Sequence, residues 1–78
     1  MKTLKYYGKE YGLVYTTYDL VKAKVYGDIL NKLFIRDYGD KYLREKMVVL
    51  LNHSIMKSGK TRHELYVKFP WANYVHKI

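Results

Sequence analysis

The sequence contains no cysteine and only one proline, Pro70. Without cysteine, neither a disulfide nor a thiolate metal site can support the fold, which leaves apolar burial or a partner subunit. No apolar run approaches the roughly 18 residues of a membrane-spanning helix. The segment MKTLKYYGKEYG also lacks the apolar region of a signal peptide. We therefore expect a soluble, cytoplasmic protein with no membrane partner.

Acidic residues are scarce, because seven Asp and Glu face fifteen Lys and Arg, for a net charge of +8. Such an excess attracts polyanions through steering and counterion release. Nucleic acid, an acidic protein surface and no polyanion partner at all are the alternatives. Arginine occurs only at positions 36, 44 and 62. Because lysine binds phosphate as a point charge, the composition favours backbone contacts over base reading.

The chain has 78 residues, of which 49% are hydrophobic, including ten tyrosines. Such a composition predicts folding, not disorder. We expect one compact domain, residues 1–78, with a core close to the lower limit for independent stability. Exposed tyrosines around so small a core make a homodimer possible.

The first eighteen residues predict a β-hairpin. Residues 3–7 (TLKYY) and 13–17 (LVYTT) are rich in β-branched and aromatic residues. Between them, residues 8–12 form a segment bracketed by glycines, which suits a five-residue turn.

The triplet Tyr-Gly-Asp occurs at residues 26–28 and again at 38–40. We interpret it as a boundary between helices and not as a ligand motif: glycine ends one helix and aspartate caps the next. The first helix would begin at Thr16, with Asp19 completing a capping box. Gly27 could instead lie inside one longer helix, at a cost of about 1 kcal/mol. Apolar residues recur at helical spacing on both sides of the first triplet, namely Leu20, Val21, Val25, Ile29, Leu30, Leu33 and Phe34.

Residues 40–58 predict the long central helix of the domain, ended by Gly59. Apolar residues fall on one stripe at helical spacing. The stripe comprises Leu43, Met47, Leu50, Leu51, Ser54 and Ile55.

Residues 61–69 (TRHELYVKF) alternate as in a half-buried strand, with His63, Leu65 and Val67 on one side. Pro70 must end this strand or lie at an edge, and residues 74–78 could return as a last strand. The predicted fold class is therefore α+β: an N-terminal β-hairpin, two or three helices including a long central one, and a C-terminal strand or hairpin.

Helices followed by a hairpin resemble the order of a winged helix, with a helix-turn-helix formed by residues 28–35 and 40–58. The charged first turns of the second helix would enter the major groove of DNA. Asp40 and Glu45 count against this interpretation, as does the apolar second half of the helix. An ordinary solvated basic face is the alternative. The predicted nucleic-acid contacts are Lys32, Arg36, Lys41, Arg44, Lys46, Lys57, Lys60 and Arg62.

Tyrosines interleaved with lysines near the N-terminus suit base stacking, and they suit a protein-binding surface equally well. The second hypothesis is therefore a small protein that binds and modulates or inhibits a larger one. Its contact residues would be Tyr6, Tyr7, Tyr11 and Tyr15.

No pattern indicates catalysis, a cofactor or a metal. The three histidines occupy three different predicted elements without metal-ligand spacing. A nuclease could use His63 with Lys68, Arg62 or Tyr66, but His63 alternates away from these three. We therefore expect a non-catalytic protein that binds nucleic acid, with DNA favoured, through a basic face.

Overall fold

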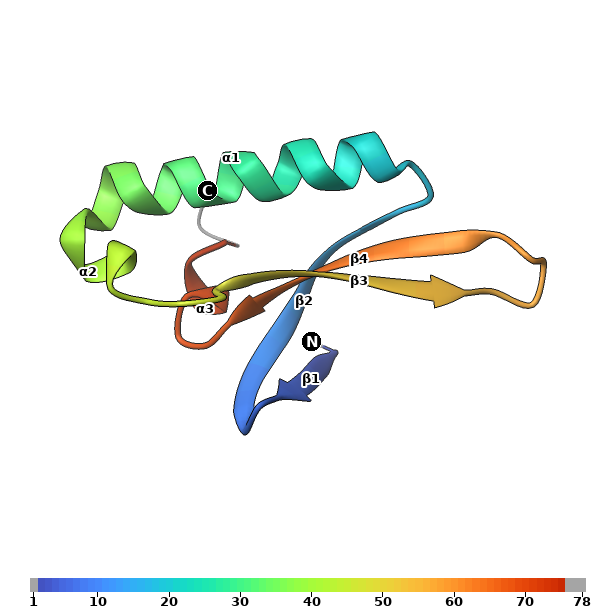
Figure 1. The fold of residues 1–78 in the computed structure, drawn as a ribbon, viewed down its shortest axis with the longest axis horizontal. Coiled ribbons are helices and arrows are strands. Elements are labelled where there is room, and N and C mark those ends of the chain that lie inside the picture. The colour runs from blue at the N-terminus through green and yellow to red at the C-terminus, as the bar shows by residue number, and fades with distance from the viewer. Residues whose placement is uncertain (1, 76–78) are drawn as a thin grey trace.

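Residues 2–75 are described by a computed structural model and form a four-stranded antiparallel sheet with one long helix across it (Figure 1). The elements in chain order are β1 (Thr3–Tyr6), β2 (Lys9–Thr17), α1 (Leu20–Tyr38), α2 (Asp40–Leu43), β3 (Val49–Ile55), β4 (Thr61–Lys68) and α3 (Ala72–Val75). The strands lie in the order β1-β2-β4-β3. The predicted α+β class is confirmed, with its N-terminal hairpin, central helices and late strand.

The hairpin of β1 and β2 is confirmed, but its turn is shorter than predicted. Tyr6 pairs with Lys9, so the turn consists of Tyr7 and Gly8. Both have positive φ, 50° and 74°, the requirement of the two-residue turn that matches strand twist. The expected loop over residues 8–12 is wrong, because β2 continues through Gly12, which pairs with Val67 of β4.

Helix α1 begins after a capping aspartate, Asp19, and ends at a glycine, Gly39. Asp19 is its N-cap and accepts from the N–H groups of Val21 (2.9 Å) and Lys22 (3.2 Å). The start expected at Thr16 is therefore wrong, since β2 extends to Thr17. The break at Gly39 is confirmed: its φ is 53° and its N–H donates to the carbonyl of Ile35. Within residues 2–75, no helix is both long and apolar enough to cross a membrane.

Gly27 lies within α1, so the predicted break there is wrong and the single longer helix is correct. Gly27 is buried where the helix crosses the sheet. A Cβ at this position would lie 3.6 Å from Leu65 and 3.8 Å from Val49. Ala23, Gly27, Leu30 and Phe34 form a continuous buried stripe, and its contact with the sheet outweighs the low helix propensity of glycine.

The long helix predicted for residues 40–58 is wrong. Only Asp40–Leu43 is helical, and residues 49–55 form β3, which pairs along its whole length with β4. A short apolar run such as VVLL suits a buried strand as well as a helix, and local periodicity cannot separate the two. Gly59, with φ of 86°, belongs to the turn between β3 and β4 and not to a helix end. The domain's long helix is α1.

The strand predicted for residues 61–69 is confirmed as β4. The last strand expected for residues 74–78 is wrong at its start, because Tyr74 and Val75 belong to α3. Residues 76–78 lie outside the described part. The Phe69–Pro70 peptide bond that precedes Trp71 is cis.

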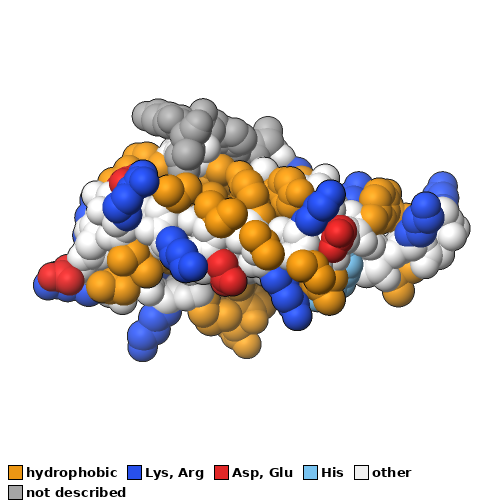
Figure 2. Space-filling model, turned by 90° about the horizontal axis from the view of Figure 1, so that it is seen from above, with side chains coloured by type: hydrophobic (Ala, Val, Ile, Leu, Met, Phe, Trp, Pro, Cys, Tyr) orange, Lys and Arg blue, Asp and Glu red, His pale blue; other side chains and the backbone are white. Residues whose placement is uncertain are grey.

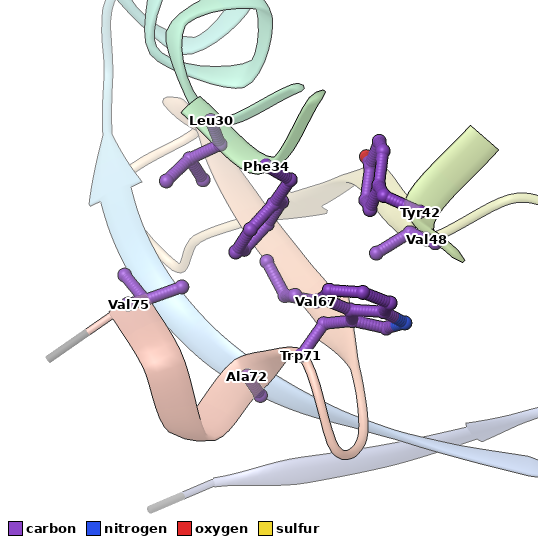
Figure 3. Packing of buried hydrophobic residues seen from close by; sticks show 8 residues of the cluster. All are labelled: Leu30, Phe34, Tyr42, Val48, Val67, Trp71, Ala72 and Val75. Atoms are coloured by element: carbon purple, nitrogen blue, oxygen red, sulfur yellow. The ribbon is translucent and has the colours of Figure 1, made fainter. Parts of the chain in front are cut away.

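The hydrophobic core lies between the sheet and the C-terminal half of α1 (Figure 3). Trp71 is 2% exposed and packs within 5.6 Å, ring centre to ring centre, of Phe34 and Tyr42. Two stretches of the chain, residues 30–48 and 67–75, contribute to this cluster, which comprises Leu30, Phe34, Tyr42, Val48, Val67, Trp71, Ala72 and Val75.

Candidate functional site

The two faces of the sheet differ in what covers them. Cross-strand pairing places His63, Leu65 and Val67 on the face covered by α1, as the position of Gly27 over Leu65 shows. Glu64 and Tyr66 point to the other face. Both are nonetheless buried, with 1% and 2% exposure. The predicted alternation is confirmed, but β4 is a central strand buried on both faces and not a half-buried one.

The predicted nucleic-acid contacts lie in two groups at opposite ends of a molecule 42 Å long. One end, at the C-terminal part of α1 and α2, carries Lys32, Arg36, Lys41, Arg44 and Lys46. The other end is the turn between β3 and β4, with Lys57 and Lys60, and Arg62 follows at the start of β4 (Figure 1). The structure therefore does not gather all eight cations at one end of the molecule.

No long recognition helix carries Lys41, Arg44 and Lys46. Lys41 belongs to the four-residue α2, with its ammonium 6.0 Å from the Trp71 ring centre. Arg44 and Lys46 lie in the segment after α2, interleaved with Glu45, which pairs with Lys68 at 3.0 Å. The helix-turn-helix arrangement is wrong, while nucleic-acid binding itself stays a prediction.

The four tyrosines of the second hypothesis do not share a surface. Tyr7 is 84% exposed and packs edge-on against Tyr6 at the β1–β2 turn. Tyr11 is buried, and its hydroxyl donates to the carbonyl of Met47. Tyr15 stacks on Tyr26 of α1, with ring centres 4.5 Å apart. Only Tyr6 and Tyr7 could contact a partner as an aromatic pair.

Glu64 lies in a buried network on the sheet face opposite α1. Its carboxylate accepts from Asn52 Nδ2 at 2.9 Å and from Arg62 Nη2 at 2.8 Å, and lies 3.6 Å from Lys2 Nζ. Burial raises the pKa of Glu64. The two hydrogen bonds and the charges of Lys2 and Arg62 lower it more, so the pKa lies below the ordinary value. Arg62 is therefore engaged within the domain, and we assign it a structural role.

His53 and His63 face each other across β3 and β4, with their Nδ1 atoms 2.7 Å apart. One ring must donate and the other accept at that distance. Residues 2–75 contain no cluster of three or more His, Cys, Asp or Glu that could hold a metal. The nuclease arrangement is not assembled either. Arg62 and Lys68 make ion pairs with Glu64 and Glu45, and their side chains leave β4 on the face opposite His63.

The outward face of α1 carries an apolar row that no part of the described chain covers. Val21, Val25 and Ile29 are 68%, 51% and 46% exposed; we call these three residues the α1 stripe. They recur every four residues and so lie on one side of the helix. Lys32 and Arg36 continue that side toward the C-terminus. Figure 2 shows hydrophobic side chains over α1, with several Lys and Arg and fewer Asp and Glu side chains around them.

A groove of about 270 Å³ opens between α1 and β3. Its apolar walls come from Ala23 and Gly27 of the helix and from Val49, Leu51 and Leu65 of the sheet. Lys24, Asp28 and Asn31 also line it. The absence of a side chain at Gly27 contributes to the hollow.

The sequence pattern alone points to neither the α1 stripe nor the groove as a functional surface. The residues of the α1 stripe were visible there as part of a helical pattern, but that pattern does not say which side faces the core. The small residues Ala23 and Gly27, four apart and in line with Leu30 and Phe34, are the signal that marks the side against the sheet.

Comparison with protein-family models, with curated proteins and with solved structures gives no match. Function must therefore be argued from these surfaces.

Proposed function

We propose that the protein is a non-catalytic binding module that docks on an acidic protein through the outward face of α1. The main support is the α1 stripe, three exposed aliphatic residues in a row, continued by Lys32 and by Arg36, whose Nε also donates to Asp37 Oδ1 at 2.9 Å. A complementary partner offers an apolar patch beside an acidic one. The net charge of +8 would accelerate the encounter. The cytoplasmic location expected from the sequence stays part of this proposal.

The stripe is large enough to matter energetically. Burying a whole Val or Ile side chain contributes about 1.5–3 kcal/mol. The stripe residues are roughly half exposed, so docking would bury about half of each, or about 2–4 kcal/mol for the three together. Since about 1.4 kcal/mol is a factor of ten, loss of the stripe should weaken binding more than tenfold.

A photo-crosslinking residue at Val25 would trap the partner in cells, and purified partner would then be titrated by calorimetry. We expect an acidic partner whose Kd rises about tenfold or more in the V21S/V25S/I29S protein. The control is Leu43→Ser, which removes another exposed side chain (59%) outside the stripe. Circular dichroism must show that both variants fold. Equal affinity of the triple variant and the wild type would refute the proposal.

Nucleic acid is the second candidate, favoured by the five cations at the α2 end. Replacing Lys41 and Arg44 together should remove duplex binding if that end contacts phosphates. Affinity should also fall steeply with salt, by about 0.9 log unit per log unit of salt for each phosphate neutralised. The K57E/K60E protein, altered at the opposite end, serves as the control. Absence of duplex binding at physiological salt would leave the protein-binding proposal alone.

A further inference from the structure

Strand β3 presents an unpaired backbone edge. In the sheet it is the last strand, hydrogen-bonded only to β4 among residues 2–75. Lys68 N donates to Val48 O, and Met56 N donates to Lys60 O, both at 2.8 Å. Backbone groups along an antiparallel strand point alternately toward and away from the neighbouring strand. Because Val48 and Met56 bond to β4, the even-numbered residues between them also direct their N–H and C=O groups toward β4. The residues that turn their N–H and C=O groups outward are Val49, Leu51, His53 and Ile55.

This edge has none of the features that usually prevent strands from pairing. β3 is seven residues long, VLLNHSI, with no charge and no proline. Natural edge strands are typically short, or interrupted by lysine, proline or a bulge. The other edge, β1, has four residues, including Lys5. Only β3 is therefore a long, apolar, open template within the described part of the sheet.

The groove lies directly beside this edge. Val49 and Leu51 turn their backbone groups outward, while their side chains line the groove beneath α1. A strand added to β3 would place alternate side chains on the same face as these two residues. One of them would lie at the mouth of the groove, against Ala23 and Gly27. An edge strand with a neighbouring helix and an apolar groove between them is the arrangement by which domains capture extended peptides.

Cations bracket the uncharged edge at both ends. Arg44 and Lys46 precede β3, and Lys57 and Lys60 follow it; all four are exposed and make no ion pair within residues 2–75. Lys24 and Asp28 both line the groove, so the preference for acidic residues comes from the cations at the two ends of β3. We propose that β3 and the groove bind an extended segment of another protein that has apolar residues at alternate central positions and acidic residues at its ends.

A second copy of this chain fits the same edge poorly. Two β3 strands paired antiparallel about Asn52 would set Lys57 of one copy near Lys46 of the other. Like charges opposite each other in a sheet are destabilising, and each copy carries a net charge of +8. The observations therefore favour an acidic segment. This site does not involve the α1 stripe, so it stands or fails independently of the proposed function.

The probe is a pool of peptides of about nine residues, slightly longer than β3. Two Glu residues stand at each end, and Val, Ile or Leu alternates with Thr between them. Titration into ¹⁵N-labelled protein should shift the amide signals of Leu51 and His53 and slow their hydrogen exchange. A pool with Lys at both ends should bind about tenfold or more weakly. Absence of binding by the acidic pool would overturn the proposal.

Two pools with N-methyl groups at alternate residues separate strand addition from side-chain contact alone. One set blocks the amides that face β3, and the other blocks those that face away. We expect one set to lose binding and the other to keep it. Loss by both sets or retention by both contradicts strand addition.

Variants at His53 test whether the outward backbone N–H of β3 takes part in binding the peptide. His53→Pro removes an outward N–H without removing a bond to β4 and should weaken binding about tenfold. His53→Ala, which keeps that N–H, should bind within about twofold of wild type. Should the proline variant fail to fold, the methylated pools still decide. Sedimentation that shows a dimer, with the His53 amide already protected in the free protein, would identify a second copy as the occupant and overturn the proposal.

Discussion

Replacing Gly27 by alanine should stabilise the protein, although glycine at this position is buried. Alanine is favoured over glycine inside a helix by about 1 kcal/mol. The new Cβ would lie 3.6 Å from Leu65 Cδ2 and 3.8 Å from Val49 Cγ1, which are ordinary contact distances. Neither the helix nor the sheet has to move. The added methyl contributes up to about 0.8 kcal/mol through burial, for a total of about 1–2 kcal/mol.

The assay is urea unfolding, followed by circular dichroism, with a thermal scan as a second readout. For a domain of this size, 1 kcal/mol raises Tm by about 4–8 °C. Gly39→Ala is the matched control, because the same substitution there should have the opposite sign. Gly39 has φ of 53° and ψ of −126° and ends α1, and this sparsely populated conformation disfavours alanine by about 1–3 kcal/mol. The pair thus tests whether α1 runs through Gly27 and ends at Gly39.

A loss of stability in Gly27→Ala would refute this reasoning. It would mean either that the helix is interrupted at residue 27, as the repeated Tyr-Gly-Asp suggested, or that helix and sheet are closer than the distances above. An unchanged Gly39→Ala protein would similarly show that α1 does not end in a conformation that needs glycine. Stabilisation by the first substitution with destabilisation by the second is the only result consistent with a single helix over Leu20–Tyr38.

Two further predictions concern the core and the buried carboxylate. Trp71→Ala should destabilise the protein by about 3–5 kcal/mol, whereas Tyr7→Ala at an exposed turn should change stability by no more than about 0.5 kcal/mol; similar urea midpoints for the two would contradict the packing around Trp71. The lowered pKa of Glu64 predicts stability that is present above the ordinary carboxyl value of 4.5 and is lost as pH falls through the lower folded-state pKa, because the unfolded chain binds more protons there. Unfolding midpoints measured across the acid range should therefore fall less steeply with decreasing pH in Glu64→Gln than in wild type, and parallel pH profiles would contradict the buried network.

Local side-chain chemistry allowed several features to be predicted from the sequence. Gly39 ends a helix because its backbone conformation disfavours other residues, and that requirement acts through the residue itself. Residues 61–68 alternate in a pattern that only a strand satisfies. The hairpin near the N-terminus follows from β-rich segments flanking a glycine turn. These features made the α+β class predictable.

Other features depend on contacts between distant parts of the chain. Residues 49–55 contain apolar spacing compatible with a helix, and they form a strand because β4 is available to pair with them. Gly27 is tolerated inside α1 because the sheet lies beneath it.

Local sequence patterns do not predict the candidate sites either, because both sites depend on how distant parts of the chain pack together. Whether Val21, Val25 and Ile29 face the core or the outside depends on which side of α1 the sheet occupies. Whether β3 is an open edge depends on the strand order. The sequence by itself determined the charge, the helix end at Gly39 and the fold class, since each resides in single residues or short periods. Only the tertiary structure decided which surfaces are left free, because burial is a property of elements packed together.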